Sequence, residues 1–289
     1  MKYLINQVIR SEKLHRTPLF RSSLGFAVVC LLVFTACATV PHTGRRQFNM
    51  LSDTQMNALG LKVFNEIMAR EREIQDDRIR GIVKRVTERV SGAAEALDSP
   101  KFQWDVKVVE SDEPNAVCLP GGKIVVFSGI LPYARNEAGL AAVISHEIAH
   151  AVARHGGERL SQQLTLRGAI AMGSEILKEK DGKLDAKSRA ILGALGLGGT
   201  LGVILPYSRT HELEADRIGQ LYMARAGYDP SEGVNLWTRM AQIKKPPLPE
   251  WLSTHPADGE RVRRLKETLP QANAQYAQAP VKYGKGTPL

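Results

Sequence analysis

Three residues in the middle of the chain have the types and the spacing of a catalytic metal site. His146, Glu147 and His150 lie in the stretch HEIAH. In a helix, four residues advance by about 400°, which places the two histidines about 40° apart on one face. Both imidazoles can then bind one ion, with the Glu147 carboxylate beside a water molecule on that ion. Zinc suits such a site, because imidazole and carboxylate ligands with one open position are typical of catalytic zinc.

A surface helix with histidines placed by chance is the alternative interpretation of HEIAH. The residues that flank this stretch are apolar, so the helix would bury two histidines and a glutamate without partners, which is costly. The sequence therefore favours a metal site.

A later acidic segment offers the third protein ligand that a catalytic zinc site needs. Glu212 and Asp216 are four residues apart and share one face of a predicted helix. We expect Glu212 to bind zinc and Asp216 to accept a hydrogen bond from the far nitrogen of a ligand histidine, which fixes the tautomer of that histidine. Glu214 points about 200° away from Glu212, so we expect it to be exposed to solvent.

The chain resembles metallopeptidase family 48, the group of HtpX-like, CAAX-prenyl-protease-like and mitochondrial Oma-type zinc peptidases. The resemblance spans roughly residues 50–270 and rests on four separated motifs in the family's order. These motifs are NAVCLPGG from Asn115, HEIAH, SRTHELEAD from Ser208, and STHP from Ser253 with Arg261. The resemblance implies an α+β, mainly helical, zincin-like (gluzincin) metallopeptidase domain with a small sheet beside the HExxH helix.

The resemblance also implies roles for five residues of the metal site. His146, His150 and Glu212 match the zinc ligands of the family. Glu147 matches the general base, and Asp216 matches the aspartate that follows the third ligand.

Three further positions match family residues at the substrate cleft. Asn115 matches a residue at the cleft edge, where a substrate backbone would extend a strand, and His255 and Arg261 match positions proposed to stabilise the oxyanion. Taken singly, His255 is also typical of a turn before a proline, and Arg261 of a solvated helix face. His255 could alternatively bind zinc when no substrate is bound, as a latency switch. Cys118 departs from the family's usual small apolar residue, at a position without chemistry.

These residues together predict hydrolysis of peptide bonds. Zinc lowers the pKa of a bound water, Glu147 takes the proton and later protonates the leaving amine, and zinc with His255 or Arg261 holds the oxyanion. We expect a metalloendopeptidase that acts on misfolded or unassembled envelope proteins in protein quality control. The alternative is a chaperone-like envelope assembly factor with latent protease activity, although a pure binding protein would not need Glu147. A prenyl-protein peptidase is disfavoured, because those enzymes use several long membrane spans and this sequence lacks them.

The spacing of apolar residues predicts the elements that position these side chains. Two helices are predicted in 52–90, a central helix from Asn136 to near His155, and later helices in 208–226, from Pro230 and in 260–269. Strands are predicted at 104–109 and 123–127, and Pro120–Gly122 is predicted to form a turn just before the second strand. The apolar, glycine-rich segment 190–206 is interpreted as a core helix or a lid over the substrate, with a membrane-dipping element as the alternative. His155 and His211 are interpreted as structural.

The N-terminus has the layout of a secretory signal, with basic residues up to Arg21 followed by an uncharged apolar run from Ser22 to Ala36. The run ends before Cys37 in a stretch that resembles a bacterial lipobox, so residues 1–36 are predicted to be a signal peptide and Cys37 to be acylated. An uncleaved anchor is the alternative. Since Ala38 is not an aspartate, we expect a periplasm-facing lipoprotein of the bacterial outer membrane, with an inner-membrane anchor as the alternative. The lipobox-like cysteine also argues against a mitochondrial protein.

Domain organisation and composition complete the prediction. A lipidated tether is expected at 37–50, the zinc metallopeptidase domain at 51–270 and a disordered tail at 271–289, which is rich in Gln, Ala, Pro and Gly. The net charge of the 289 residues is +9, but the first 36 residues contribute +4 of it and no base-reading motif is present, so nucleic acid is not an expected partner. The expected partners are unfolded protein substrates and, through the lipid, a membrane. Three cysteines allow no disulfide framework.

Overall fold

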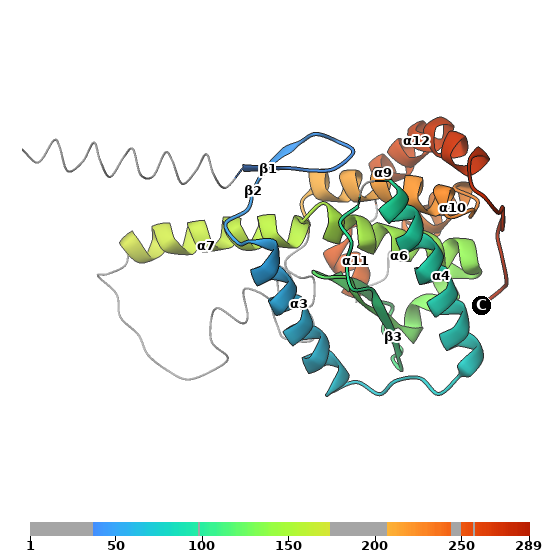
Figure 1. Cartoon of the computed structure of the whole chain (residues 1–289), viewed down its shortest axis with the longest axis horizontal. Helices are drawn as coiled ribbons and strands as arrows, with labels where there is room; N and C mark the ends of the chain where they lie inside the picture. The colour runs from blue at the N-terminus through green and yellow to red at the C-terminus, as the bar shows by residue number, and fades with distance from the viewer. Residues whose placement is uncertain (1–36, 98, 174–206, 244–249, 257) are drawn as a thin grey trace, which may run out of the picture. The chain divides into compact units, whose positions relative to one another are not determined.

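The helix that carries His146 and His150 lies at the centre of the fold. The computed structural model describes residues 37–97, 99–173, 207–243, 250–256 and 258–289 (Figure 1). Helix α6 (Glu137–Val152) begins after Asn136, whose side chain accepts a hydrogen bond from the backbone of Gly139. All of its residues except Ala151 are buried. A helix that is buried on every face is a core helix, and this burial takes the HEIAH side chains out of bulk solvent.

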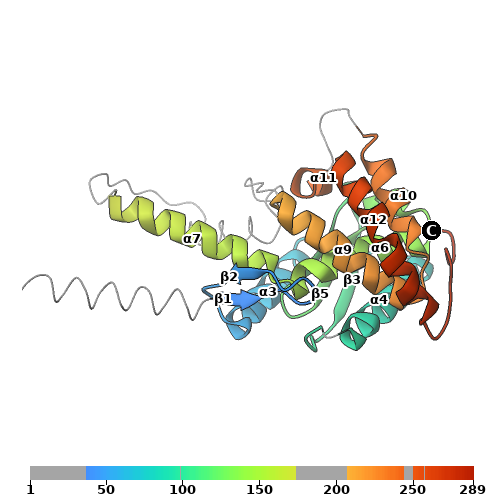
Figure 2. The ribbon, with the colours of Figure 1, turned by 90° about the horizontal axis from the view of Figure 1, so that it is seen from above.

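Helix α9 (Arg209–Arg225) runs against α6 and brings the acidic segment to the histidines. The contact is close at Gly219, where a Cβ atom would lie 2.9 Å from the backbone nitrogen of His146. Only a glycine allows this approach. Helices α4 (Asp77–Ala96), α10 (Ser231–Met240) and α12 (Gly259–Ala277) pack around this pair, as Figure 2 shows for α10 and α12.

A three-stranded sheet lies beside α6. Strands β3 (Asp105–Val109) and β5 (Lys123–Phe127) are parallel, and β4 (Ala116–Leu119) pairs with β5 in the antiparallel direction, so the order is β3-β5-β4. Strand β4 is therefore an edge strand, and it packs against α6. The sequence predicts β3 and β5 but not β4, because all four residues of β4 are buried and show no alternation of apolar and polar side chains. The Pro120–Gly122 turn connects β4 to β5, and both of its glycines have a φ of +86°.

The remaining elements surround this centre. They are β1 (Cys37–Thr39) and β2 (Arg46–Phe48), which form a two-stranded sheet, and α3 (Asp53–Met68), the 3-10 helix η1 (Ser128–Ile130), α5 (Leu131–Ala134), α7 (His155–Gly173) and α11 (Glu250–Thr254). The mainly helical α+β fold with a small sheet beside the HExxH helix is confirmed. The predicted signal peptide and the apolar segment 190–206 lie outside the described residues. Among the helices described, none has the length and apolar character to span a membrane.

The C-terminal tail is ordered, so the expectation of disorder is wrong. Helix α12 continues to Ala277, and the chain then returns along the start of α6. The backbone nitrogen of Glu137 donates to Thr287 at 2.9 Å, and that of Tyr283 donates to Gly227 at 2.7 Å. The guanidinium of Arg89 lies 3.5 Å from the centre of the Tyr283 ring. A polar composition predicts disorder only when the backbone finds no partners, and here the core supplies them.

Candidate metal centre

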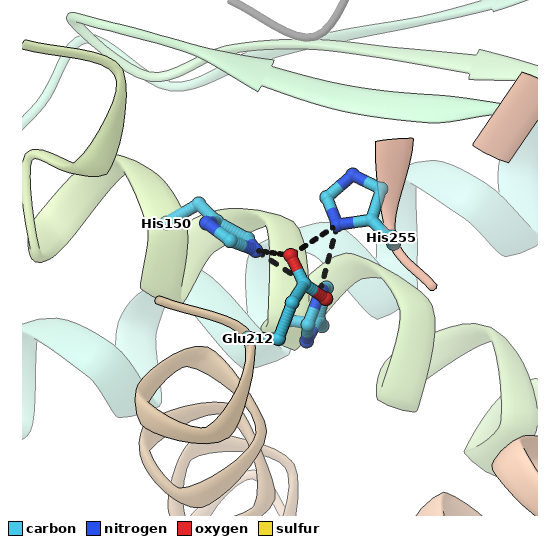
Figure 3. Close-up of side chains that lie close together, drawn as sticks. His150, Glu212 and His255 are labelled. Carbon is cyan, nitrogen blue, oxygen red and sulfur yellow. Dashed lines mark hydrogen bonds and ion pairs between the residues drawn. The ribbon is translucent and has the colours of Figure 1, made fainter. Parts of the chain in front are cut away.

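Four buried side chains converge on one point between α6, α9 and the end of α11. They are His146, His150, Glu212 and His255, and one ligand atom of each lies within 4.8 Å of all the others. Each of the four is at most 3% exposed. Figure 3 shows Glu212 between His150 and His255, with the dashed contacts meeting at its carboxylate. The described residues contain no other such cluster.

The spacing of these atoms suits a metal ion with tetrahedral coordination. The Nε2 atoms of His146 and His150 are 3.1 Å apart, and Nδ1 of His255 lies 3.2 Å from Nε2 of His146 and 3.1 Å from Oε1 of Glu212. Oε1 of Glu212 is 3.4 Å from Nε2 of His150. A tetrahedral ion with ligands at about 2.0–2.1 Å separates neighbouring ligand atoms by about 3.3–3.4 Å. The four side chains therefore need little movement to bind one ion.

The outer nitrogen of His146 contacts Asp216, as the spacing of Glu212 and Asp216 suggests. Nδ1 of His146 is 3.0 Å from Oδ1 of Asp216. An ionised carboxylate only accepts hydrogen bonds, so Nδ1 holds the proton and Nε2 presents its lone pair to the cluster. Burial lowers the pKa of His146, but the hydrogen bonds and charges of Asp216 and Glu212 outweigh it and raise the pKa to about 9. A metal ion thus competes with a proton for Nε2.

Arg261 lies behind this group and pairs with both acidic residues. Its Nε and Nη2 atoms donate to the two oxygens of Asp216 at 2.7 and 2.6 Å, and Nη1 lies 2.7 Å from Oε2 of Glu212. The guanidinium also lies 3.3 Å from the centre of the Trp237 ring, and the residue is 1% exposed. Burial raises the pKa of Glu212, but the charges of His255 and Arg261 hold it well below its usual value. Arg261 therefore keeps both carboxylates ionised, and its donors are engaged with them.

Glu147 lies beside the cluster and is oriented by a tryptophan. Nε1 of Trp251 donates to Oε1 of Glu147 at 2.9 Å, and Nε2 of His255 is 3.6 Å from the same oxygen. The Trp251 ring stacks on Trp237, with centres 4.8 Å apart. Sequence reasoning missed both tryptophans. The one signal available was that Trp251 lies four residues before His255 in the same short segment.

Comparison with known proteins agrees with this geometry. The model of peptidase family M48 matches residues 81–269, a range that contains all four clustered residues and Glu147. The chain belongs to peptidase family M48. It is 34% identical over 250 residues to the mitochondrial metalloendopeptidase OMA1 of Schizosaccharomyces pombe, an alignment that covers 84% of this chain and 69% of that protein.

Two other relatives show the same likeness over less of their own length. The chain is 30% identical to the human mitochondrial metalloendopeptidase OMA1, over 94% of this chain and 53% of that protein. It is 27% identical to the beta-barrel assembly-enhancing protease of Escherichia coli, over 83% of this chain and 49% of that protein. The chain thus spans about half the length of these two family M48 members. The family match and the ligand cluster identify a metalloendopeptidase.

The location expected from the N-terminal sequence is wrong. We expected an outer-membrane lipoprotein of a bacterium, but relatives from fungi, a plant and animals, at 30–36% identity, are named as mitochondrial proteins. Two bacterial relatives, from Yersinia pestis and Escherichia coli, are at 30% and 27%. A basic and apolar N-terminus followed by a cysteine is a short pattern, and it is less specific than identity over 250 residues. Acylation of Cys37, which lies in β1, stays a prediction, and intact-mass analysis would test it.

Asn115 lies directly before the edge strand β4. The residue is 3% exposed, and its side-chain oxygen accepts a hydrogen bond from the backbone of Ala116 at 2.9 Å. Its backbone oxygen accepts from the nitrogen of Phe127 at 3.0 Å. Asn115 thus begins the pairing of β4 with β5, at the edge of the sheet that packs against α6.

Glu214 differs from its prediction, because it is 7% exposed and not solvated. It accepts hydrogen bonds from Thr43 and Arg45, and Nε2 of His155 contacts the same oxygen as Arg45. Burial raises its pKa, but the hydrogen bonds from His155, Thr43 and Arg45 lower it below the usual value. The helical spacing of Glu212 and Glu214 is as predicted, but the face of α9 that carries Glu214 is covered by an N-terminal segment whose position the sequence does not reveal.

The two histidines that were interpreted as structural lie in the same buried region. The rings of His155 and His211 stack, with centres 4.4 Å apart, and Nε2 of His211 contacts Oε2 of Glu158 at 2.9 Å. Burial lowers the pKa of His155 to about 4. Tyr207 covers His150, with ring centres 4.1 Å apart. His155, which was interpreted as structural, and Tyr207, which the sequence analysis did not single out, both lie against the ligand His150.

Proposed function

We propose that this metalloendopeptidase uses one zinc ion and hydrolyses misfolded or unassembled proteins. The observation that carries the proposal is the buried cluster of His146, His150, Glu212 and His255 with Glu147 beside it. Imidazole nitrogens and one carboxylate at tetrahedral spacing are the donor set that zinc prefers in catalytic sites. Calcium and magnesium prefer sites made of oxygen ligands, so this donor set disfavours them.

Each residue around the site has a distinct part in peptide hydrolysis. A bound zinc ion would supply a water of lowered pKa and a positive charge for the oxyanion. Glu147, oriented by Trp251, takes the proton of the attacking water and passes it to the leaving amine. Asp216 and Arg261 act as positioning residues, because their polar atoms are engaged with each other and with His146 and Glu212.

The surroundings of the site suit an extended and apolar substrate. A pocket adjoins His150, and its lining includes the apolar side chains of Met56, Phe102 and Pro120. The edge strand β4 can pair with an extended peptide, which is a common mode of recognition. Folded proteins bury their apolar side chains and their strand edges, whereas misfolded or unassembled proteins expose both. Asn115, at the start of β4, would orient the substrate backbone.

A change of one carboxylate tests the proposal. Glu147→Gln removes the group that moves the proton but leaves all four clustered residues in place, so we expect zinc content to stay at one per chain and hydrolysis of unfolded casein to fall by about 10²–10⁴-fold. The measurements are metal analysis after dialysis and peptide release over time. Glu113→Gln is a matched control on the surface and should cleave like the wild type. Unchanged turnover of Glu147→Gln would refute the mechanism.

A second candidate function rests on the position of His255. Its Nδ1 atom lies where a water or a substrate oxygen would complete the coordination of zinc, and catalytic zinc sites need that position open. An assembly factor that binds unfolded clients and cleaves rarely would use such a closed site, and one relative is named as a beta-barrel assembly-enhancing protease.

His255→Ala separates the two candidates. If His255 mainly closes the site, casein hydrolysis rises in this variant. If His255 mainly stabilises the oxyanion, hydrolysis falls by about 10²–10³-fold. Binding of unfolded casein to Glu147→Gln, measured in parallel, shows whether clients bind without being cleaved.

A further inference from the structure

The outer nitrogen of His150 contacts a second histidine, and not a carboxylate as in His146. Nδ1 of His150 is 2.9 Å from Nδ1 of His155. On the other side of the His155 ring, Nε2 is 3.0 Å from Oε2 of Glu214. Both histidines and Glu214 are buried, with exposures of 3%, 0% and 7%. The three side chains thus form one line from the metal site toward the N-terminal part of the chain.

Hydrogen-bond chemistry fixes where the protons lie along this line. A carboxylate only accepts, so Nε2 of His155 carries a proton and donates it to Glu214. The neutral His155 ring then has its lone pair on Nδ1, which can only accept, so the proton between the two rings belongs to Nδ1 of His150. His150 is thereby left with its lone pair on Nε2, the atom that faces Glu212 and His146. This is the tautomer that binds a metal through Nε2.

A break between two helices makes the contact possible. In an uninterrupted helix, His155 would lie about 140° around the axis from His150 and could not meet it. Helix α6 ends at Val152, and Arg154 adopts a φ of +55°, which is rare for a residue with a side chain. An ion pair with Asp53 holds Arg154. Helix α7 starts at His155, and the changed direction turns its ring back onto His150.

The turn between β1 and β2 completes the line behind Glu214. Nε of Arg45 donates to Oε2 of Glu214 at 2.9 Å, and the Thr43 hydroxyl donates to Oε1. Two further nitrogens of Arg45 bind both oxygens of Glu158, at 3.0 and 2.8 Å. Arg45 is thus a fork that fixes Glu214 in position and charge. Thr43 and Arg45 lie outside residues 81–269, which the family model matches.

We propose that His155, Glu214 and Arg45 are positioning residues that set the tautomer and the orientation of the ligand His150. The N-terminal turn that carries Arg45 is, on this proposal, part of the metal site. The proposal rests on the function proposed above only in assuming that zinc binds at the four clustered residues. Partners of this kind, which hold the far nitrogen of a ligand histidine, typically change metal affinity by about 10- to 100-fold when removed.

The experiment compares zinc affinities of the full chain by competition with a chromogenic chelator, without substrate. His155→Phe keeps a flat ring but removes both ring nitrogens, and we expect zinc affinity to fall by about 10- to 100-fold. His155→Gln can accept from His150 and donate to Glu214, so it should recover most of the affinity. Arg45→Met should lower the affinity by less, because Thr43 still contacts Glu214.

His211→Phe is the matched control. His211 is also buried and stacks on His155, but its Nε2 atom contacts Glu158 and not His150. Its substitution should lower the melting temperature of the zinc-free chain while zinc affinity stays near that of the wild type. Equal losses of zinc affinity in His155→Phe and His211→Phe, or no recovery of affinity in His155→Gln, would overturn the proposed positioning role of His155. A wild-type chain that binds no zinc would overturn the proposed function instead, so the two failures are distinguishable.

Discussion

The two ligand histidines of α6 are supported in different ways. His146 contacts a carboxylate directly, and Asp216 is in turn paired with Arg261 inside the core. His150 reaches its carboxylate through the ring of His155, and Glu214 is paired with Arg45. The far nitrogen of His146 is thus held by a direct contact with a carboxylate, whereas that of His150 is held by two contacts in series, through His155 to Glu214.

The difference also concerns where each support comes from. Arg261 is 1% exposed and, like Asp216, lies in the range that the family model matches. The Arg45 side chain is 25% exposed and belongs to an N-terminal turn outside that range. The support of His146 is therefore built into the core of the family's domain, whereas that of His150 depends on the docking of a segment that precedes it. This contrast predicts unequal effects of substitutions on the two sides.

The largest effect is expected from Arg261. Arg261→Met leaves the buried Asp216 and Glu212 without their guanidinium, and breaking a buried pair in this way costs about 3–5 kcal/mol of unfolding free energy. Arg45→Met, at a partly exposed site, should cost much less. Urea unfolding of both variants at pH 7 checks the difference. Similar losses of unfolding free energy in the two variants would mean that Arg45 and Arg261 contribute equally to stability, which would contradict the contrast between the two sides.

The second effect concerns zinc affinity on the His146 side. Asp216→Asn keeps the shape of the side chain but removes the charge that stabilises the proton on Nδ1 of His146, so we expect zinc affinity to fall by about 10-fold or more. Asp258→Asn is the control, because Asp258 accepts from the backbone of Arg261 and caps α12, a position that asparagine fills equally well. Chelator competition should show a loss in the first variant only. A loss of zinc affinity in both variants would mean that the effect arises from a disturbed Arg261 and not from the contact of Asp216 with the ligand His146.

The His146 side could be predicted from sequence, and the His150 side could not, for a geometric reason. His146, Glu147 and His150 share a helix, and so do Glu212 and Asp216, so spacings of three or four residues place them. His155 is five residues from His150, a spacing that points away in a regular helix, and the contact depends on the positive φ of Arg154. No local sequence pattern predicts this break between α6 and α7.

Long-range packing also explains two other features that the sequence did not predict. Glu214 is assigned to solvent by helical spacing alone, yet residues more than 160 positions earlier cover it. The tail after Gln271 is polar in composition, but its backbone pairs with Glu137 and Gly227. In each case the local sequence describes the element correctly, while the partner comes from a distant segment that carries no matching signal.

The smallest effect tests how the N-terminal turn docks. Burial raises the pKa of Glu158, but hydrogen bonds from His211 and Arg45 outweigh it and lower the pKa from 4.5 to about 2. A carboxylate with a lowered pKa in the folded state contributes stability above pH 4.5, and that stability is lost as the pH falls toward 2.

Glu158→Gln should therefore have a lower urea midpoint than the wild type at pH 7, and the gap between the two should shrink at pH 3. Because the Glu158 pair with Arg45 is partly solvated, the gap at pH 7 should be smaller than the loss in Arg261→Met. Zinc affinity should change little, since Glu158 holds Arg45 and not His155. A gap that stays constant from pH 7 to pH 3 would mean that the Glu158 carboxylate gains no free energy from His211 or Arg45, and the docking of the turn would then rest on Glu214 alone.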